Sequence, residues 1–474
     1  MNSKIIEKIK SDEILSKLTE SFQNEIYLVG GSVRDYFMDI ESHDRDLIII
    51  DEDAKEFSLK AAEVFEAVFV PLDDENKIYR LVMPNKIDYL DITNPVEDSI
   101  EKDLLRRDLT INSIAVNLRT GEIVDITGGL NDIKNECIKH IREENFTDDP
   151  LRLLRVFRFQ SKYGFNIDSE TLKLINKYSN LINKPAFERI NYEILRLFGG
   201  KYAHIALENA DKSGILEKIF PFVKELKLVP KNSHHHLRLF EHCVETVKQI
   251  QNLYENSLEP VKSHLEKSDF GGHTRLAHLK LSGFLHDIGK FSTWTIEGDR
   301  HRFIKHDDVG SKMVKKLLKD MHLSNKQIDY VALMVKNHIY PSSLMVNPEI
   351  NDKIMMRFLR KMEDNAIDVI ILAQADRLSA RGPEISEEII NNNINRLNML
   401  MNFCIEKAKN LEPLPKLLDG NEVMEIFNLK PSQKLGYIMR ELHEAQLSGE
   451  ILTKEHALEF VKNLNFEENK DDSL

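Results

Sequence analysis

The sequence predicts an α+β protein in which a small N-terminal α/β domain precedes a helical remainder. Between about residues 24 and 130, short runs rich in β-branched and aromatic residues alternate with short helical stretches. From about residue 148 onward, hydrophobic residues recur with the period of a helix, and Pro, Gly or Asn stands at the breaks. The chain has 474 residues, of which 42% are hydrophobic, so it can bury several cores.

The α/β domain is expected to be built on one sheet. Seven runs are predicted to be its strands: EIYLVGG, RDLIIID, EAVFVPL, KIYRLVM, KIDYLDI, SIAVNLR and EIVDI.

Further changes in composition predict four parts in the whole chain. A histidine-rich stretch begins at KNSHHHLRLFEH and closes near RGPEIS. The predicted parts are a head at 1–145, a helical neck and body at 146–230, a histidine-rich helical domain at 231–383 and a helical C-terminal segment at 384–474.

Composition excludes several classes of protein. No apolar run approaches the roughly 20 residues that span a bilayer, and the charged N-terminal pattern lacks the apolar region of a signal peptide. The cysteines, Cys137, Cys243 and Cys404, lie far apart and have no disulfide or zinc-ligand spacing. We therefore expect a cytoplasmic protein without a membrane partner. Its net charge of −13 means that any contact with nucleic acid must use a local basic surface.

The segment YLVGGSVRD has the pattern of a phosphate-binding turn. A strand that ends at Val29 runs into Gly30 and Gly31, and a helix is expected to begin near Ser32. Two glycines allow the backbone to approach a triphosphate, and the helix N-terminus offers free N–H groups to its oxygens. A simple tight connection between a strand and a helix has the same pattern.

A pair of aspartates follows on the next predicted strand. Asp44 and Asp46 alternate in SHDRDLIIID, so both carboxylates should lie on the same face of the sheet. Two carboxylates beside a phosphate-binding turn suit Mg²⁺, which prefers oxygen ligands. Asp88 and Asp91 lie on a neighbouring predicted strand, and one of them is expected to complete the metal set; solvation at strand ends is the alternative.

Five motifs in order carry a resemblance to a known family. GGSVRD, HDRD, RRDLTINSIAV, VDITGGLNDIKN and DDPLRLLRVFRF, spread over roughly residues 24 to 225, resemble the class II CCA-adding enzyme and bacterial poly(A) polymerase family. The resemblance implies a nucleotidyltransferase head followed by helical neck and body regions. It implies that Asp44, Asp46 and Asp88 are the catalytic carboxylates, the first two as Mg²⁺ ligands. Nucleotide binding is implied for Gly30, Gly31, Arg34, Arg107, Asp108 and Asn112.

The motif DDPLRLLRVFRF predicts a helix that reads a base. Arg152, Arg155 and Arg158 stand at i, i+3 and i+6, which places them on one ridge. With Asp149 one turn from Arg152, an acceptor and a donor fork are available for the edge of a base, which in this family replaces a template. The family has Glu where this chain has Asp148. An ordinary amphipathic helix with basic residues facing solvent is the alternative.

The histidine-rich domain predicts a second metal site. Several histidines and aspartates lie in apolar helical surroundings, where an unpaired polar group is costly to bury and a metal ion would satisfy it. The motif HDIGK at residues 286–290 resembles that of the HD phosphohydrolase superfamily. The resemblance implies Mn²⁺, Ni²⁺, Fe²⁺ or Mg²⁺ held by His242, His286, Asp287 and Asp376, with Lys290 nearby and with His306 and His338 serving a second metal or a phosphate.

The predicted function is template-independent addition of nucleotides from CTP and ATP to the 3′ end of tRNA, with release of pyrophosphate. A phosphatase or phosphodiesterase activity is expected of the HD domain. Two alternatives share these features: a bacterial-type poly(A) polymerase, and an HD hydrolase of nucleotides or cyclic phosphates with a non-catalytic RNA-binding head.

Two further expectations concern the tRNA end. The segment from Asp88 to Arg106 is shorter than the loop that the family associates with the change from C to A addition, so CCA addition and CC addition both stay open. The C-terminal segment resembles a tRNA-holding tail, for which simple helix packing is the alternative.

Overall fold

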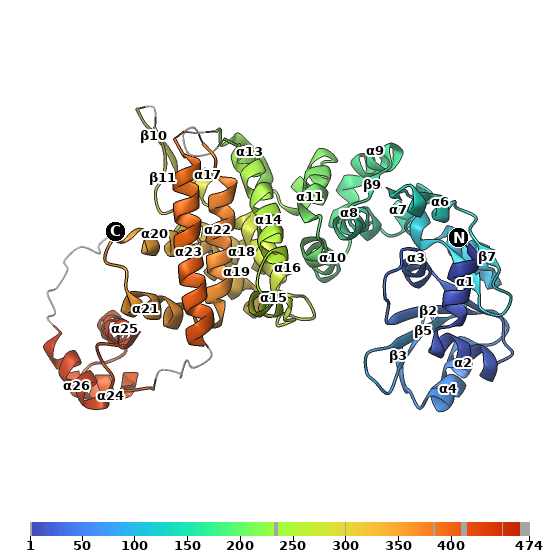
Figure 1. Ribbon diagram of the computed structural model, residues 1–474, viewed down its shortest axis with the longest axis horizontal. Helices are drawn as coiled ribbons and strands as arrows, with labels where there is room; N and C mark the ends of the chain where they lie inside the picture. Colours follow the sequence, from blue (N-terminus) through green and yellow to red (C-terminus); the bar gives the residue numbers. More distant parts are fainter. Residues whose placement is uncertain are drawn as a thin grey trace. The chain divides into compact units, whose positions relative to one another are not determined.

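The computed structural model describes residues 2–231, 236–298, 300–382, 384–408, 415–447 and 449–464 (Figure 1). Its contacts divide the chain into two compact units. Unit 1 comprises Met1–Lys224 with Met321–Leu323, and unit 2 comprises Glu225–Asp320 with Ser324–Leu474. The division falls near the predicted boundary at residue 230, whereas the finer division into four parts stays a prediction.

Unit 1 begins with a mixed sheet of seven strands in the order β3-β4-β5-β2-β1-β6-β7. Within this sheet β2 and β5 pair in parallel, and the other neighbours are antiparallel. The strands are β1 (Ile26–Val29), β2 (Asp44–Ile49), β3 (Val68–Asp73), β4 (Ile78–Val82), β5 (Tyr89–Thr93), β6 (Ala115–Asn117) and β7 (Ile123–Val124). Each overlaps one of the seven predicted runs and extends beyond it by at most one residue at either end, so the predicted α/β head is confirmed.

Both faces of this sheet are covered, because apolar side chains alternate along its central strands. Leu28 and Leu47 join the core that includes helix α4 (Ala54–Phe65). Val29 and Ile48 point to the opposite face and pack with Leu104 of α5 (Ile100–Leu105). The alternation fixes which face every polar residue of β2 occupies.

Helices make up the rest of unit 1, and among them α8 packs against α10 and α11. They are α1 (Asn2–Lys10), α2 (Glu13–Ser21), α3 (Gly31–Phe37), α6 (Gly129–Lys134), α7 (Glu144–Asp148), α8 (Leu151–Tyr163), α9 (Ser169–Tyr178), α10 (Phe187–Gly199), α11 (Ala203–Lys212) and α12 (Leu216–Ile219), with α13 (Val223–Leu228) at the division. A short parallel pair, β8 (Cys137–Ile138) with β9 (Asn166–Ile167), ties the start of this region together. The neck is therefore not entirely helical.

Unit 2 is helical around α14, α16 and α22, which pack against one another, and α23 packs on α22 (Figure 1). Its helices up to residue 408 are α14 (Leu239–Glu255), α15 (Glu259–Glu266), α16 (Arg275–Leu285), α17 (Lys290–Thr293), α18 (His306–Asp320), α19 (Asn325–Asn337), α20 (Tyr340–Val346), α21 (Asp352–Met362), α22 (Ala366–Ser379) and α23 (Glu387–Ala408). The last helices, α24 (Gly420–Phe427), α25 (Gln433–Leu447) and α26 (Lys454–Asn463), have a small core of their own that includes Val423, Ile438 and Val461.

A β-hairpin interrupts the helices of unit 2 and corrects the prediction that this domain is wholly helical. The strands β10 (Trp294–Glu297) and β11 (Arg300–Phe303) pair antiparallel. Gly298, at a φ of 59°, starts the connection between them. The hairpin forms because WTIE and RHRF alternate in polarity on either side of a glycine-containing turn.

No helix among the described stretches is long and apolar enough to cross a bilayer.

One buried carboxylate joins four helices of unit 2. Asp368 of α22 accepts hydrogen bonds from Tyr330 Oη of α19 at 2.7 Å and from Arg275 Nη2 of α16 at 3.0 Å. His264 Nε2 of α15 lies 2.7 Å from the same carboxylate. Burial alone would raise the pKa of Asp368, but the hydrogen bond with His264 and the charge of Arg275 hold it below its ordinary value. The ionised carboxylate therefore stabilises the packing of these helices.

We expect Asp368→Asn to lower the free energy of unfolding by about 3 kcal/mol at pH 7, because it removes the buried negative charge to which Arg275 donates and leaves that arginine only the more exposed carboxylates of Asp269 and Asp364. A carboxylate with a lowered pKa stabilises the fold above its unfolded-state pKa, and this contribution is lost as the pH falls through the folded-state value. The difference between wild type and variant should therefore persist from pH 7 to about pH 4 and narrow below it. Urea unfolding followed by fluorescence measures it, since the single tryptophan of the chain, Trp294, lies in unit 2.

Asp329→Asn is the matched control. Its carboxylate is 70% exposed and pairs with Lys315 at 3.2 Å, so its loss should change the unfolding free energy by less than about 1 kcal/mol. Equal destabilisation by both substitutions would contradict the role given to Asp368.

Candidate functional site

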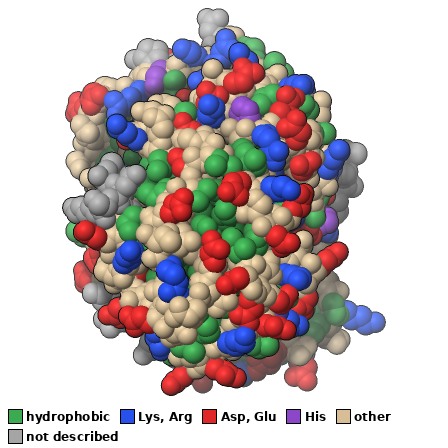
Figure 2. Space-filling model, turned by 90° about the vertical axis from the view of Figure 1, so that its right-hand side faces the viewer, with side chains coloured by type: hydrophobic (Ala, Val, Ile, Leu, Met, Phe, Trp, Pro, Cys, Tyr) green, Lys and Arg blue, Asp and Glu red, His purple; other side chains and the backbone are tan. Residues whose placement is uncertain are grey.

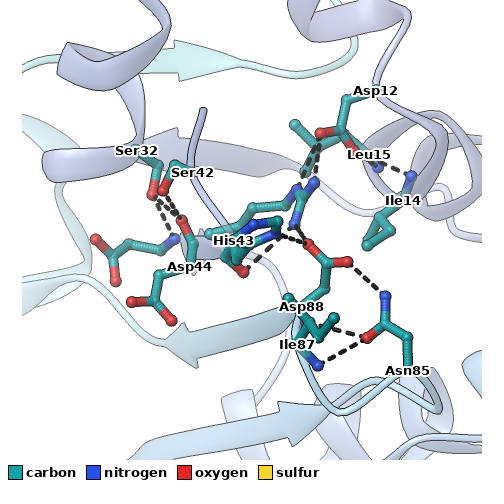
Figure 3. Close-up of polar contacts among 12 residues, drawn as sticks. Asp12, Ile14, Leu15, Ser32, Ser42, His43, Asp44, Asn85, Ile87 and Asp88 are labelled. Atoms are coloured by element: carbon teal, nitrogen blue, oxygen red, sulfur yellow. Dashed lines mark hydrogen bonds and ion pairs between the residues drawn. The ribbon is translucent and has the colours of Figure 1, made fainter. Parts of the chain in front are cut away.

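A serine joins the diglycine turn to strand β2. Gly30 has a φ of 68°, and its N–H donates to the carbonyl of Ile114 at 3.0 Å. Ser32, at the start of α3, donates its hydroxyl to the carbonyl of Asp44 at 3.0 Å and accepts the N–H of Asp46 at 2.9 Å (Figure 3). The turn and the two aspartates are thus held together through one side chain.

Asp44 and Asp46 lie on the same face of β2, the face of Ile48. Asp46 is also the register partner of Asp91 on the parallel strand β5, so three carboxylates share this face. Burial, and the negative charges of Asp91 and Asp44, raise the pKa of Asp46 to about 6, although Arg107 opposes the rise. Carboxylates that repel one another in this way fit a bound divalent cation, which would relieve the repulsion.

Asp88 lies elsewhere, which corrects its expected place as the third carboxylate. Its Oδ1 accepts a hydrogen bond from Arg45 Nη1 at 2.8 Å, and Arg45 also donates to Asp12 at 2.7 Å. In Figure 3 Asp88 is directed toward Asp12, whereas the carboxylate of Asp44 points away from both. The reason is register: Asp88 precedes β5, and Arg45 projects to the opposite face from its neighbours in β2.

The residue that takes the third place, Asp91, has an arginine partner of its own. Arg80 of β4 donates two hydrogen bonds to the Asp91 carboxylate, both of 2.7 Å. This bidentate pair fixes the orientation of Asp91 on the face of the sheet.

Arg107 lies directly against the diglycine turn. A Cβ atom added to Gly30 would lie 2.4 Å from Arg107 Nη1, so any larger residue there would displace the guanidinium from its present position. Arg107 Nε donates to the buried carboxylate of Asp103 at 3.0 Å, which orients it. A positive charge is therefore fixed beside the turn and close enough to Asp46 to affect its pKa.

Arg34 is buried and held in place from three sides. Its guanidinium donates to Asp35 at 2.9 and 2.8 Å and also to the Oδ1 atom of Asn112. It lies 5.3 Å from the ring centroid of Phe159 and 5.0 Å from that of Tyr163. The Tyr163 hydroxyl donates to Asp35 at 3.1 Å. Arg34 thus connects the turn to helix α8.

Two of the three arginines on the α8 ridge, Arg155 and Arg158, are paired with carboxylates. Asp108 accepts a hydrogen bond from Asn112 at 3.0 Å and another from Arg155 Nε at 2.7 Å. Arg158 donates to Glu193 of α10 at 3.0 Å. Burial would raise the pKa of Asp108, but the charge of Arg155 and these hydrogen bonds hold it well below its ordinary value. The ridge is therefore largely paired and half-buried, which corrects the alternative of basic residues simply facing solvent.

Sequence reasoning missed Glu193, although a signal was present. Glu193 is 2% exposed and lies among Ile190, Ile194 and Leu197 on the apolar face of α10. A carboxylate at such a position predicts a buried cationic partner.

Asp149 and Arg152 lie at the start of α8, as their spacing predicts. Asp149 precedes the helix and accepts a hydrogen bond from Arg189 Nη2 at 3.0 Å. Arg152 is in the first turn and donates from Nη1 to the carbonyl of Asn145 at 3.0 Å. Each side chain is oriented by one partner and is partly exposed.

Charge over the surface is mixed. On the face shown in Figure 2, acidic and basic side chains are interspersed around a central group of hydrophobic side chains. The expectation that any contact with nucleic acid uses a local basic surface stays a prediction.

In unit 2, the four predicted metal ligands come together with the two histidines predicted to serve a second metal or a phosphate. The cluster is formed by His242, His286, Asp287, His306, His338 and Asp376, and ligand atoms from it form three overlapping groups within 4.8 Å. His242 Nε2 lies 3.1 Å from Asp376 Oδ1, and His286 Nε2 lies 3.2 Å from Asp287 Oδ2. The residues that the sequence separates by more than a hundred positions are thus brought to one centre.

Three of these histidines are oriented by the same local contact. The Nδ1 atoms of His286, His306 and His338 lie 2.8, 2.8 and 2.7 Å from backbone carbonyls three residues earlier in the chain. A carbonyl only accepts, so each Nδ1 carries the proton and each Nε2 is left as a ligand atom. Metal-binding histidines are commonly oriented in this way.

Asp287 lies between two sets of histidines. Its Oδ2 faces His242 and His286, at 3.5 and 3.2 Å, and its Oδ1 faces His306 and His338, at 3.2 and 3.6 Å. Burial alone would lower the pKa of His286, but Asp287 and Asp376 raise it to about 10. The buried carboxylates therefore favour positive charge at this centre, and the imidazole and carboxylate donors fit a divalent transition metal.

Lys290 approaches the same carboxylate. Its Nζ lies 2.6 Å from Asp287 Oδ2, which places the ammonium group of Lys290 at the edge of the cluster.

The sequence matches three known families in succession. Residues 26–139 match the poly A polymerase head domain, residues 164–227 the probable RNA- and SrmB-binding site of polymerase A, and residues 239–381 the HD domain.

A solved structure shares the fold. The CCA-adding enzyme of Thermotoga maritima, in complex with tRNA, has a TM-score of 0.57 at 20% identity, over 97% of both chains. This likeness confirms the predicted arrangement of a sheet-containing head followed by a helical body.

Two relatives match nearly the whole chain. An A-adding tRNA nucleotidyltransferase of Deinococcus radiodurans is 31% identical over 447 residues, which cover 92% of this chain and 94% of the relative. A CC-adding tRNA nucleotidyltransferase of Thermus thermophilus is 28% identical over 450 residues, covering 92% and 93%. The chain is therefore an enzyme, and it belongs to the family of class II tRNA nucleotidyltransferases and bacterial poly(A) polymerases.

Proposed function

We propose that this enzyme transfers nucleotides from CTP or ATP to the 3′ end of tRNA. The observation that carries the proposal is the set of Asp44, Asp46 and Asp91 on one face of the sheet, attached through Ser32 to the diglycine turn. The names of the full-length relatives support tRNA as the acceptor.

The three carboxylates are proposed to hold Mg²⁺. When bound, Mg²⁺ neutralises the triphosphate and favours ionisation of the attacking 3′-hydroxyl. The protein contributes positions: β2 and β5 fix the carboxylates, and Ser32 fixes their distance from the turn that receives the phosphates.

The nucleotide is proposed to bind over Gly30 and Gly31. Arg107, held by Asp103, would meet the triphosphate beside the turn. Asn112 and Asp108 would meet the sugar, and Arg34 acts as a positioning residue because it is buried and donates to Asn112.

Selection of the base is proposed for the start of α8. Asp149 and Arg152 present an acceptor and a donor fork there, and Arg155 and Arg158 hold the helix to Asp108 and Glu193. The paired ridge keeps the reading groups in one geometry, which a protein without a template strand needs for discrimination.

Two observations support a proposal for which nucleotides are added. The stretch from Asp88 to Arg106 is short, and both full-length relatives named above add only part of the CCA end. We propose that this enzyme likewise adds either CC or the terminal A.

A second activity is proposed for unit 2, carried by the six-residue cluster. Two histidine sets on either side of Asp287 would hold two divalent ions, which activate water for hydrolysis of a phosphate ester. Lys290, beside Asp287, would stabilise the negative charge of the phosphate.

We expect Asp44→Asn and Asp46→Asn to reduce incorporation by about 100-fold or more, because each removes a metal ligand. The assay uses the full chain, Mg²⁺, labelled CTP or ATP, and tRNA that ends either before CCA or after CC. His286→Ala should leave incorporation within about twofold and abolish metal-dependent phosphatase activity. Joint loss of both activities in any folded variant would contradict the division of functions, and long A tracts on either tRNA would indicate a poly(A) polymerase.

The third carboxylate is tested by a matched pair. Asp91→Asn should reduce incorporation by about tenfold or more, because it removes a negative charge beside Asp46. Asp88→Asn also breaks one arginine pair but lies on the other side of β2, so it should leave incorporation within about twofold. The opposite result in the same assay would restore Asp88 to the site.

The close approach of Arg107 is tested at Gly30. Gly30→Ala adds a Cβ that collides with the guanidinium, so we expect KM for the nucleotide to rise by about tenfold or more. Gly271→Ala has the same backbone strain, with a φ of 66°, but nothing lies within 4 Å of its added Cβ. It should lower stability by about 1 kcal/mol and leave KM unchanged. A similar KM for both variants would argue against contact between Arg107 and the nucleotide.

A further inference from the structure

The β10–β11 hairpin lies between α17 and α18 (Figure 1), and residues next to both of its ends contact the candidate metal-binding cluster of unit 2. Lys290, four residues before Trp294, pairs with Asp287 at 2.6 Å. His306, three residues after Phe303, lies 3.2 Å from the same aspartate. The base of the hairpin is therefore fixed at the edge of the cluster.

One face of the hairpin is apolar and aromatic. The register pairs Trp294 with Phe303 and Ile296 with His301, so these four side chains lie on the same face. Thr295 and the charged residues of the hairpin lie on the other. Ile296 is 61% exposed, so the apolar face reaches solvent.

The aromatic face leads to the cluster. Lys290 Nζ lies 5.6 Å from the ring centroid of Phe303, and the Phe303 carbonyl accepts the Nδ1 proton of His306. Trp294 and Phe303 form the cross-strand pair at the base of the hairpin, where both strands join the rest of unit 2. The indole of Trp294 is therefore the partly exposed aromatic group beside Phe303 and Lys290.

The indole ring of Trp294 is held in one orientation by His301. Its ring stacks on His301 with centroids 5.6 Å apart and planes 13° from parallel, and its Nε1 donates to His301 Nδ1 at 2.9 Å. The side chain is partly exposed. A planar group oriented by a second ring loses little freedom when a base stacks on it.

The hairpin is also a basic segment in an acidic chain. From residue 290 to 306 the sequence has four lysines and arginines against two acidic residues, whereas the whole chain has a net charge of −13. Arg302 pairs with Glu297 and Lys290 with Asp287, so the remaining excess of positive charge adds a weak attraction for phosphorylated ligands.

From these observations we infer that the hairpin is the substrate-recognition element of the metal cluster and that it takes a nucleoside phosphate. The base stacks against Trp294 and His301, and the phosphate lies toward Lys290 and the ligands around Asp287. The inference rests on the proposed hydrolase function of unit 2. The same chemistry is presented by a free nucleotide and by the phosphorylated end of an RNA.

The fluorescence of Trp294 tests this directly, because it is the single tryptophan of the chain. The full chain is mixed in a stopped-flow instrument with adenosine 3′-monophosphate, with an RNA pentanucleotide bearing a 3′-phosphate, or with inorganic phosphate. We expect the first two probes to quench the fluorescence of Trp294 in the binding phase, before turnover, and to do so saturably. Inorganic phosphate should not quench it. Tighter binding of the pentanucleotide by about tenfold would identify an RNA end as the source; equal or weaker binding would identify a free nucleotide.

Two variants that keep the indole sharpen the test. His301→Ala removes the stacking partner and should raise Kd for adenosine 3′-monophosphate by about tenfold. Thr295→Ala, on the opposite face of the same hairpin, should leave Kd within about twofold. Absence of quenching by both nucleotide probes, equal quenching by inorganic phosphate, or equal Kd values in the two variants would overturn the inference. Quenching without any phosphate-ester hydrolysis would instead refute the hydrolase and leave the binding site standing.

Discussion

The hydrogen bonds of Ser32 are the constraint on which the head depends. A phosphate-binding turn and a carboxylate pair are each common, and neither has chemical meaning unless the distance between them is fixed. Ser32 fixes it with one hydroxyl, which donates to the carbonyl of Asp44 and accepts the N–H of Asp46. Because both contacts are to the backbone, the side chains of the aspartates stay available for a metal ion. The alternation of β2 then places these two carboxylates on the α5 face and Arg45 on the other.

The two units solve one electrostatic problem in different ways. In unit 1, arginines are paired with carboxylates, as Arg155 is with Asp108 and Arg158 with Glu193. In unit 2, the cluster around Asp287 contains imidazoles and buried carboxylates, and the negative charge of the carboxylates favours a bound metal ion. The arginine–carboxylate pairs hold the side chains of unit 1 rigidly without any bound ion. The cluster of unit 2, in contrast, has donor atoms that a bound cation would satisfy. This difference fits the proposals that the head binds a nucleotide with Mg²⁺ and that the cluster of unit 2 binds metal ions of its own.

Sequence reasoning recovered the sheet because a period of two residues is a local property, visible in all seven strand runs. It could not choose between Asp88 and Asp91, since that choice depends on where β5 begins and on its register against β2. It missed the hairpin at Trp294 because the surrounding helical pattern outweighed a short alternation around Gly298. It also missed Glu193, whose partners come from a helix about forty residues away. The order of the strands along the chain and the types of residue in the site could be predicted from the sequence. Strand register and pairing between distant residues could not, because packing determines them.

Each oxygen of Asp287 faces a different pair of histidines, so one carboxylate is shared between two halves of the cluster. Turning this carboxylate toward one pair of imidazoles would move the oxygen that faces the other pair. The halves are therefore not independent compartments, and a change at Asp287 would alter the geometry of both.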